Sequence, residues 1–400
     1  MDQIQELLTR GVSEVIDKKH LEEALKSKKK LRVKLGIDPT SPNIHIGRAV
    51  VLWKLRAFQE LGHKVIFIVG DFTGLIGDTS DKDSERPMIS EAQMKVNLKT
   101  YAAQAFKILD KSKTEVQYNS KWLKKLGFIE LGSMADLFSW HEFESREVIA
   151  KRLKEGKRVS LREGLYPLMQ GYDSVAVKAD VELGGTDQRF NLLAGRTIQP
   201  MYGQPPQDIL MTEIMEGTDG RKMSSSWGNV INITAEPNDM FGKVMSIEDK
   251  LIKKYFVLAT RVEIKEIDEI LKLANPRDQK IILAEKITEL YHGGDKARAA
   301  RDNFEKKYGK KKSYSDIEAD INLAKEEVTS IIGSGTYTFN GLLSLLVKSG
   351  IVSSRTQARQ RIEEGALYVN EHRVGSNETI FHTISKGDLI KLGKKFLRVI

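Results

Sequence analysis

A strand–helix–strand unit at residues 31–71 is the feature that most constrains how this chain can fold. The segment LRVKLGIDPT alternates, with Val33, Leu35 and Ile37 on one side, and therefore predicts a strand with one buried face. A helical apolar pattern follows and stops at Gly62, and the next segment, KVIFIVGD, is apolar throughout, as in a strand covered on both faces. The unit predicts two parallel strands joined by a helix, and hence an α/β domain.

Acidic side chains follow both predicted strands. Asp38 comes directly after the first strand, and Asp71 and Asp78 come after the second. Ligands of open parallel sheets bind outside the carboxyl ends of the strands, which lie together at one edge of the sheet. Three carboxylates at that edge are more than solubility needs, so the sequence predicts a binding site there.

The length of 400 residues predicts more than one domain. After the first unit, residues 90–160 look mainly helical with a basic middle. Residues 166–235 then supply a second half, with a helix, a short strand, a Gly-Gly turn and another strand. Residues 236–332 read as successive helices, and residues 338–400 read as a separate α+β unit that ends in a hairpin at Gly393.

The composition excludes several kinds of site. The chain has no cysteine, which excludes disulfides, thiolate zinc sites and thiol nucleophiles, and its seven histidines lack metal-ligand spacing. No run of eighteen apolar residues is present, so the sequence predicts no membrane span. The first sixteen residues read as an amphipathic helix rather than as a targeting segment.

Positive charge is concentrated at the C-terminal end. The whole chain has a net charge of +9, and residues 338–400 carry ten Lys and Arg against five Asp and Glu. Basic side chains along one surface can follow a phosphate backbone, so this unit is expected to bind nucleic acid. Six side chains are expected to make the contacts: Lys348, Arg355, Arg359, Arg361, Lys394 and Lys395.

Two short segments carry residues suited to binding phosphate. In PNIHIGRAVV, His45 and Gly47 stand where a helix begins, and a helix start offers unpaired N–H groups to an anion. The alternative is that His45 only caps the helix, and the short pattern taken alone favours that interpretation. In RKMSSS, Lys222 precedes three serines, a composition that suits either an anion site or a solvated turn.

Together the two segments resemble the signatures of the class I aminoacyl-tRNA synthetases, His-x-Gly-His and Lys-Met-Ser-Lys-Ser. They appear here as HIGR at residues 45–48 and KMSSS at residues 222–226, in the family's order and separation. Within that class, LGIDPT, GDFTGLIGD, YPLMQGYDS, GGTDQRFN and the last 62 residues are similar to the tyrosyl-tRNA synthetases. The resemblance covers essentially the whole chain.

The resemblance implies a fold and a reaction. The fold is a Rossmann-like catalytic domain at residues 1–235 with a helical insertion at about 90–160, a helical anticodon-binding domain at 236–332, and an RNA-binding domain at 338–400 like that of a small-subunit ribosomal protein. The implied enzyme is a cytoplasmic homodimer, formed through the inserted helices. It activates L-tyrosine with ATP, with magnesium on the phosphates, and passes the tyrosine to tRNA(Tyr). In-line displacement at the α-phosphorus needs no protein nucleophile, so positioning and charge stabilisation would supply the catalysis.

The resemblance also implies a role for each matching residue. Contacts to tyrosine would come from Asp78, Tyr166, Gln170, Asp173 and Gln188. Contacts to ATP would come from Gly36, Asp38, His45, Gly47, Arg48, Gly185, Asp187, Gln188, Lys222, Met223, Ser224, Ser225 and Ser226. The implied catalytic residues are Thr40, His45, Lys82, Arg86 and Lys222, with Lys82 and Arg86 on a basic loop that closes on pyrophosphate. In the family, the counterpart of Asp173 accepts the phenolic hydrogen of the substrate and that of Asp187 binds the ribose.

Three positions depart from the family pattern. Arg48 replaces the second His of the first signature, Ser225 replaces the second Lys of the other, and Lys34 stands where many members have a tyrosine that helps to bind the phenol. The loss of a lysine at position 225 predicts weaker use of ATP, partly offset by Arg48 and by the basic loop.

Two alternatives remain open from the sequence. One is the sister tryptophanyl enzyme, although an indole pocket has no use for the carboxylate of YPLMQGYDS. The other is a catalytically weakened paralogue that acts as an RNA-binding protein, which the altered signatures and the basic tail would suit.

Overall fold

The computed structural model describes residues 2–78, 90–308, 317, 319–333, 338–370, 372–375 and 383–400. Contacts divide the chain into two compact units, Met1–Arg298 and Ala299–Ile400. Lys82 and Arg86, the two residues expected on the basic loop, lie outside the described residues. Among the described helices, none combines the length and apolar character needed to cross a membrane.

The first unit is built around a sheet of six strands. They are β1 Val12–Ile16, β2 Arg32–Ile37, β3 Lys64–Val69, β4 Thr114–Tyr118, β5 Val181–Gly185 and β6 Asp208–Thr212. Their order in the sheet is β1-β6-β5-β2-β3-β4, and neighbours are parallel except for β1, which is antiparallel to β6. The predicted parallel pairing of β2 with β3 is confirmed.

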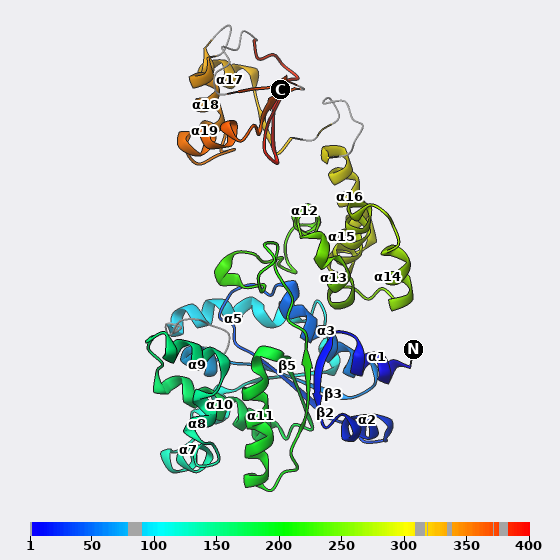
Figure 1. Cartoon of the computed structure of the whole chain (residues 1–400), viewed down its shortest axis with the longest axis vertical. Helices are drawn as coiled ribbons and strands as arrows, with labels where there is room; N and C mark the ends of the chain where they lie inside the picture. The colour runs from blue at the N-terminus through cyan, green and yellow to red at the C-terminus, as the bar shows by residue number, and fades with distance from the viewer. Residues whose placement is uncertain are drawn as a thin grey trace. The chain divides into compact units, whose positions relative to one another are not determined.

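Helices lie on both faces of this sheet. Those of the first 235 residues are α1 Gln3–Thr9, α2 Lys18–Lys26, α3 Ile46–Glu60, α4 Thr73–Ile76, α5 Glu91–Ala105, α6 Ser120–Leu123, α7 Phe128–Ala135, α8 Trp140–Glu144, α9 Glu147–Lys154, α10 Leu161–Val177 and α11 Arg189–Ile198. Helix α3 packs on β2, β3 and β5, while α10 and α11 pack against each other and on the sheet (Figure 1). The C-terminal end of α10 covers the Ile66 and Ile68 side chains of β3.

The burial of β2 corrects one prediction. The alternating pattern predicts one buried face, but Lys34, on the face assigned to solvent, is fully buried. The reason is that α10 lies over that face, where the Lys34 ammonium forms an ion pair with Glu182 of β5. The strand is therefore covered on both sides, and its polar residue is satisfied by partners distant in sequence.

Two further segments differ from expectation. The first sixteen residues do not form one helix, because Gly11 adopts a positive φ of 60° between α1 and β1. Residues 114–118 lie inside the insertion expected to be helical, but they form the edge strand β4 beside β3. Its Thr and Val residues favour extended backbone, and the edge of the sheet supplies the pairing partner.

Helices continue beyond the sheet domain. They are α12 Pro237–Met245, α13 Ile252–Ala259, α14 Ile264–Ile270, α15 Pro276–His292 and α16 Gly294–Tyr308. The side chain of Asn275 caps α15, and Pro276 occupies its first turn. Helix α15 ends at Gly293, as its composition predicts. The successive helices predicted for this part of the chain are thereby confirmed.

The second unit has its own sheet and core. Its strands are β7 Ile321–Leu323, β8 Leu367–Val369, β9 His372–Arg373, β10 Leu389–Leu392 and β11 Lys395–Val399, and its helices are α17 Lys325–Ile332, α18 Phe339–Lys348 and α19 Arg355–Glu363. The hairpin predicted at Gly393 joins β10 to β11. Residues 321–332 differ from the expected division: they lie with this sheet rather than with the preceding helices, because β7 pairs with β11 and Val328 lies in the same core.

Candidate active site

The principal cavity opens where the chain changes direction in the sheet. From β2 the chain continues outward to β3 and β4, and it then returns to the other side of β2 as β5. Such a switch point leaves a crevice at the carboxyl ends of the two central strands. A cavity of about 610 Å³ lies there, lined by the ends of β2 and β5 and by the loops that follow.

Most of the predicted site residues line this one cavity. The predicted residues that line it are Gly36, Asp38, Thr40, His45, Gly47, Arg48, Asp78, Tyr166, Gln170, Gly185, Asp187, Gln188, Lys222, Met223, Ser224, Ser225 and Ser226. Asp173 lies on the same helix as Tyr166 and Gln170 but is not part of the lining. Asp71 points elsewhere: its carboxylate accepts hydrogen bonds from the backbone N and the hydroxyl of Ser120, at the start of α6.

The two signature segments lie side by side. The backbone of His45 bridges that of Asn232 in antiparallel fashion, and the N–H of Ile46 donates to the carbonyl of Ile231 over 2.8 Å. Gly47 is needed at this junction. A Cβ atom there would come within 3.1 Å of His45 Nδ1 and 3.3 Å of the Met223 sulfur. The residues that follow the second signature thus pair directly with the first.

His45 caps the helix, as one of the two interpretations of the sequence expected, and it also lines the cavity. It is the N-cap of α3, where its Nδ1 accepts a hydrogen bond from the N–H of Arg48 at 3.3 Å. Burial, reinforced by the charges of Arg48 and Lys222, lowers the pKa of His45 to about 3. The imidazole is therefore neutral, and because Nδ1 is the acceptor, Nε2 carries the proton and can donate a hydrogen bond.

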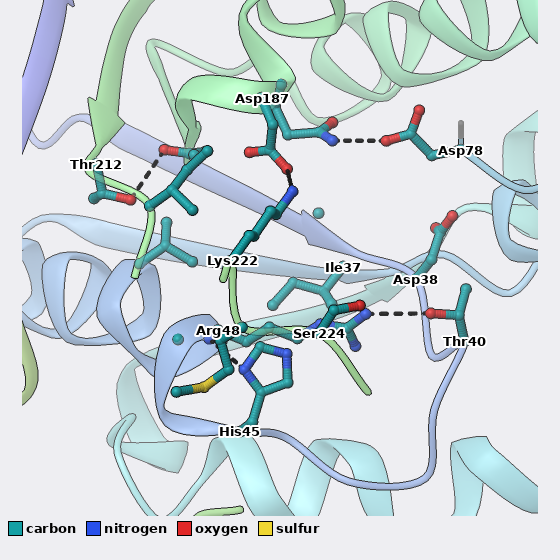
Figure 2. A pocket seen from close by; sticks show the side chains of 18 of the residues that line it. Ile37, Asp38, Thr40, His45, Arg48, Asp78, Asp187, Thr212, Lys222 and Ser224 are labelled. Carbon is teal, nitrogen blue, oxygen red and sulfur yellow. Dashed lines mark hydrogen bonds and ion pairs between the residues drawn. The ribbon is translucent and has the colours of Figure 1, made fainter. Parts of the chain in front are cut away.

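Arg48, in the first turn of α3, holds two hydroxyl groups by hydrogen bonds. Its guanidinium donates to the hydroxyl of Tyr101 at 2.7 Å. It also donates to the hydroxyl of Thr40 at 3.2 Å (Figure 2). Thr40 is thus held beside a fixed positive charge. An arginine supplies both donors from one rigid fork, which a second histidine at this position could not do.

An ion pair and a hydrogen bond link side chains across the cavity. The Lys222 ammonium lies 2.8 Å from a carboxylate oxygen of Asp187, and Gln188 donates to Asp78 at 2.6 Å (Figure 2). These four residues were expected to contact three different parts of the substrates. The structure brings them into one continuous polar surface.

The serine segment is held by an asparagine behind it. The Asn229 side chain accepts from the N–H of Ser224 at 2.8 Å and donates to the carbonyl of Lys222 at 3.0 Å and to the Asp219 carboxylate at 2.7 Å. Ser224 and Ser226 place their hydroxyl oxygens 2.9 Å apart. This arrangement gives the loop a defined shape in which several hydroxyls face one region.

At the other end of the cavity, the Asp38 carboxylate holds the phenol of Tyr166 by a hydrogen bond. Tyr166 donates to one oxygen of Asp38 at 2.8 Å, and Thr73 donates to the other at 2.7 Å. Burial and the neighbouring carboxylate of Asp38 raise the pKa of Tyr166 well above its usual value, so Tyr166 stays protonated. Asp38 therefore faces the cavity from a fixed position.

Asp173 lies beyond this end, in a buried polar cluster. Its two oxygens accept from Trp122 Nε1 at 2.7 Å and from Asn119 Nδ2 at 3.2 Å, and the side chain is almost fully buried. Burial raises the pKa of Asp173 to about 7, although the charge of Lys34 and the two donors oppose that rise. Such a carboxylate is well placed to accept one further hydrogen bond from a hydroxyl.

Trp122 and Asn119 were not predicted as site residues. They follow β4 directly, and β4 is one of the strands that the sequence analysis missed. Had TEVQY been recognised as a strand, the rule that ligands bind at the carboxyl ends of strands would have pointed to them.

Comparisons with known proteins match this geometry to one family. A family model for "tRNA synthetases class I (W and Y)" matches residues 26–309, and a model for the "Tyrosine--tRNA ligase SYY-like C-terminal domain" matches residues 320–396. The tyrosine–tRNA ligase of Carboxydothermus hydrogenoformans is 44% identical over 99% of this chain and 97% of its own length. The chain belongs to the tyrosine–tRNA ligase family. The ligase of Thermotoga maritima is 42% identical over 98% of this chain and 96% of its own.

Solved structures of this ligase family share the fold. The tyrosyl-tRNA synthetase of Archaeoglobus fulgidus, solved in complex with L-tyrosine, aligns with a TM-score of 0.61 at 22% identity, covering 75% of this chain and 99% of its own. A C-terminally truncated mitochondrial tyrosyl-tRNA synthetase of Aspergillus nidulans aligns with a TM-score of 0.64 at 21% identity, covering 76% of this chain and 94% of its own. The predicted Rossmann-like fold agrees with these likenesses.

The six basic residues expected to bind RNA are all exposed in the second unit. Arg355, Arg359 and Arg361 lie on α19, and Lys348 ends α18. Lys394 and Lys395 lie at the turn of the terminal hairpin, where Lys395 also donates to the carbonyl of Ile351 at 2.9 Å.

Proposed function

We propose that this chain activates L-tyrosine with ATP and transfers it to tRNA(Tyr), with the cavity residues acting as follows. The observation that carries the proposal is that residues of both signature segments line one cavity together with Asp78, Tyr166, Gln170 and Gln188, at the switch point of a parallel sheet. A catalytically weakened paralogue would not need to retain all of these side chains in one place.

The buried end of the cavity would hold tyrosine. Asp173 would accept the phenolic hydrogen, while Asp78, Tyr166 and Gln170 would surround the ammonium. The support for this orientation is the charge distribution: Asp78, Tyr166 and Gln170 line the cavity, and the buried carboxylate of Asp173, on the same helix as Tyr166, is held by Trp122 and Asn119. Gln188, which donates to Asp78, would complete the ammonium site.

The rest of the cavity, from Asp38 to the serine segment, would hold ATP. Gly36, Asp38, Gly185 and Asp187 follow the two central strands and would receive the adenosine, with Asp187 on the ribose hydroxyls. The phosphates would lie between the start of α3 and the serine segment, where Thr40, His45 Nε2, Lys222 and the three serine hydroxyls converge. Arg48 would act mainly by holding Thr40 and by adding charge.

Activation then requires no protein nucleophile. The tyrosine carboxylate attacks the α-phosphorus in line, the bond to the bridging oxygen breaks, and pyrophosphate leaves with the electron pair. Hydrogen bonds and positive charges that meet the departing phosphates lower the barrier, because they stabilise charge as it develops. The residues in position to do this are Thr40, His45 and Lys222.

Magnesium would enter with ATP. The phosphate side of the cavity is lined by cations and hydroxyls, and the described residues contain no cluster of three His, Asp or Glu that could hold a metal ion. The donor set therefore suits a metal carried by the nucleotide, whose chemistry would be to neutralise charge on the phosphates.

A homodimer and RNA binding complete the proposal. Helix α7 exposes Phe128 and Ile129, which are 94% and 88% accessible, a degree of exposure that favours burial against a second copy of the chain. The basic residues of the second unit would contact tRNA, in keeping with their exposure and charge. We place the enzyme in the cytoplasm, where tRNA is charged.

Amino-acid-dependent exchange between pyrophosphate and ATP tests the function. Exchange that requires tyrosine is the expected result. Exchange that requires tryptophan would favour the sister enzyme, and exchange with neither amino acid, together with retained tRNA binding, would favour the RNA-binding paralogue.

A further inference from the structure

A buried ion pair lies under the amino-acid end of the cavity. The Lys34 ammonium lies 3.0 Å from a carboxylate oxygen of Glu182, and neither side chain is exposed to solvent. The ammonium also donates to the Ser174 hydroxyl at 2.7 Å and to the backbone carbonyl of Gln170 at 3.0 Å. These three acceptors use all three of its hydrogens, so Lys34 has no donor left for a substrate.

Glu182 is saturated in the same way. Besides Lys34, its oxygens accept from Gln170 Nε2 at 3.0 Å, from the Ser174 hydroxyl at 3.1 Å and from Gln207 Nε2 at 2.5 Å. A carboxylate in a buried site needs such partners to remain ionised. Lys34 supplies the compensating charge, and the other three residues supply neutral donors.

The ion pair acts on the cavity through the side-chain amide of Gln170. An ionised carboxylate can only accept hydrogen bonds, so Gln170 must turn its NH₂ group toward Glu182. The side-chain oxygen of Gln170 is then the end of the amide that remains available to a ligand in the cavity, which Gln170 lines. The α-ammonium of an amino acid can only donate, and it is therefore complementary to an oxygen and not to an NH₂ group.

We infer that the Lys34–Glu182 pair is a specificity-determining device, which fixes the Gln170 amide so that the site prefers a ligand with an α-ammonium to one with an α-hydroxyl. This inference rests on the proposed function, in which Gln170 contacts the ammonium of tyrosine. Lys34 and Glu182 are positioning residues, since both act through Gln170. A glutamine at position 182 could present either end of its amide, so only a carboxylate kept ionised by Lys34 fixes the orientation.

The test removes both charges together, because removing one would leave the other unpaired and buried. In the Lys34→Met, Glu182→Gln double variant, the amide at position 182 can pair with either orientation of Gln170. We expect the KM for tyrosine to rise about tenfold and kcat and the KM for ATP to change less than about twofold, as for the loss of one ligand hydrogen bond. The preference in kcat/KM for tyrosine over 4-hydroxyphenyllactate, its α-hydroxyl analogue, should fall by about the same factor.

A second buried ion pair, between Arg152 of α9 and Glu163 of α10, provides a matched control. Arg152 and Glu163 lie 2.6 Å apart, are likewise buried, and brace the first turn of α10, but neither contacts Gln170. The Arg152→Met, Glu163→Gln double variant should lower thermal stability without changing the preference between the two substrates. If this control changes the preference as much as the Lys34 variant does, the pair has only a structural role and the inference is overturned.

A milder variant tests the inference if the Lys34→Met, Glu182→Gln double variant does not fold. Ser174→Ala removes one acceptor of Lys34 and one donor to Glu182 while both charges remain, and it should shift the preference in the same direction by a smaller factor. An unchanged preference in folded Ser174→Ala and in the folded double variant would overturn the inference. Calorimetric titration of the full chain with tyrosine and with the hydroxy acid measures the same preference without turnover. Absent exchange in the unmodified chain would therefore refute the proposed function, while these affinities would still decide the inference.

Discussion

The ammonium of Lys222 lies 2.8 Å from the carboxylate of Asp187, across the cavity at the carboxyl ends of β2 and β5. Both side chains are about a quarter exposed, at 28% and 24%, so the pair can exchange for other partners at low cost. In the proposed reaction Lys222 contacts the leaving phosphates and Asp187 contacts the ribose. In that reaction, ATP would therefore have to replace this contact.

Replacement of Lys222 should separate binding from chemistry. Lys222→Met is expected to slow tyrosyl-adenylate formation by about 10²- to 10³-fold, because a charge that stabilises the leaving group is lost, while the affinity for tyrosine is unchanged. Single-turnover kinetics and calorimetry provide the two measurements. Arg221→Met is the matched control, since the neighbouring Arg221 pairs with Asp219 and stacks on Trp227 outside the cavity lining. Equal losses in both variants would contradict the assignment.

His45 can be tested for capping and catalysis independently. Asparagine is a good N-cap, so His45→Asn should keep the thermal stability, while it loses the Nε2 donor and slows adenylate formation by about tenfold or more. His45→Ala should lose the cap as well, at a cost of about 1 kcal/mol in the free energy of unfolding. An Asn variant with unimpaired activation would mean that His45 only caps the helix.

The carboxyl of Asp173 predicts a pH dependence for tyrosine binding. Burial raises its pKa to about 7, and the ionised form is a stronger acceptor for the phenolic hydrogen than the protonated carboxyl, so the affinity for tyrosine should fall as the pH drops below about 7. His45, with a pKa of about 3, stays neutral throughout this range. Calorimetric titrations of tyrosine between pH 6 and pH 8, on the order of one point per half unit, would measure the slope.

Two variants identify the group responsible. Asp173→Asn should bind tyrosine with little pH dependence, whereas Lys54→Met should keep it, although burial lowers the pKa of Lys54 to about 7 as well. The Asp173 shift also has a consequence for folding. The folded, unliganded protein holds a proton that the unfolded chain loses, so this group favours folding at low pH, and the contribution disappears as the pH rises through about 7. A pH dependence of tyrosine binding that persists in Asp173→Asn would show that another group is responsible for it.

The missing lysine at position 225 predicts a gain of function. Ser225 lines the cavity, and Ser225→Lys should lower the KM for ATP by about three- to tenfold, as expected for one added charge–phosphate contact. Steady-state exchange at varied ATP concentration provides the measurement, with Ser225→Met as the uncharged control. If the KM for ATP does not fall, Arg48 and the other cations already supply sufficient charge.

The exposed face of α7 predicts the oligomeric state. A Phe128→Asp, Ile129→Asp double variant should convert a dimer to a monomer in analytical ultracentrifugation, because two charges would have to be buried in the interface. Leu273→Asp, at an exposed leucine that follows α14, should leave the dimer intact. A wild-type chain that sediments as a monomer would contradict the proposal directly.

Much of the site could be predicted from local sequence. The alternation in LRVKLGIDPT and the apolar run in KVIFIVGD predict β2 and β3, because the side-chain period of a strand depends on neighbouring residues alone. Asp38 and Asp78 then fall at the carboxyl ends of parallel strands. The spacing of Tyr166, Gln170 and Asp173 places them on one face of α10, since three- and four-residue steps stay on one side of a helix.

Other features depended on residues far apart in the chain. Lys34 was assigned to a solvated face because it is polar, and only the packing of α10 over β2 buries it beside Glu182. β4 was missed because an edge strand of five residues has too short a pattern to outweigh the helices around it. Trp122 and Asn119 were missed for the same reason, since their role follows from the position of β4.

The sequence by itself determined the strand–helix–strand unit, the two signature segments and the basic tail, because period, turn residues and charge are local properties. Tertiary structure decided which polar residues are buried and which partner each one has. Burial is set by the element that packs on a face, and Lys34 and Glu182 are joined only where β2, β5 and α10 meet.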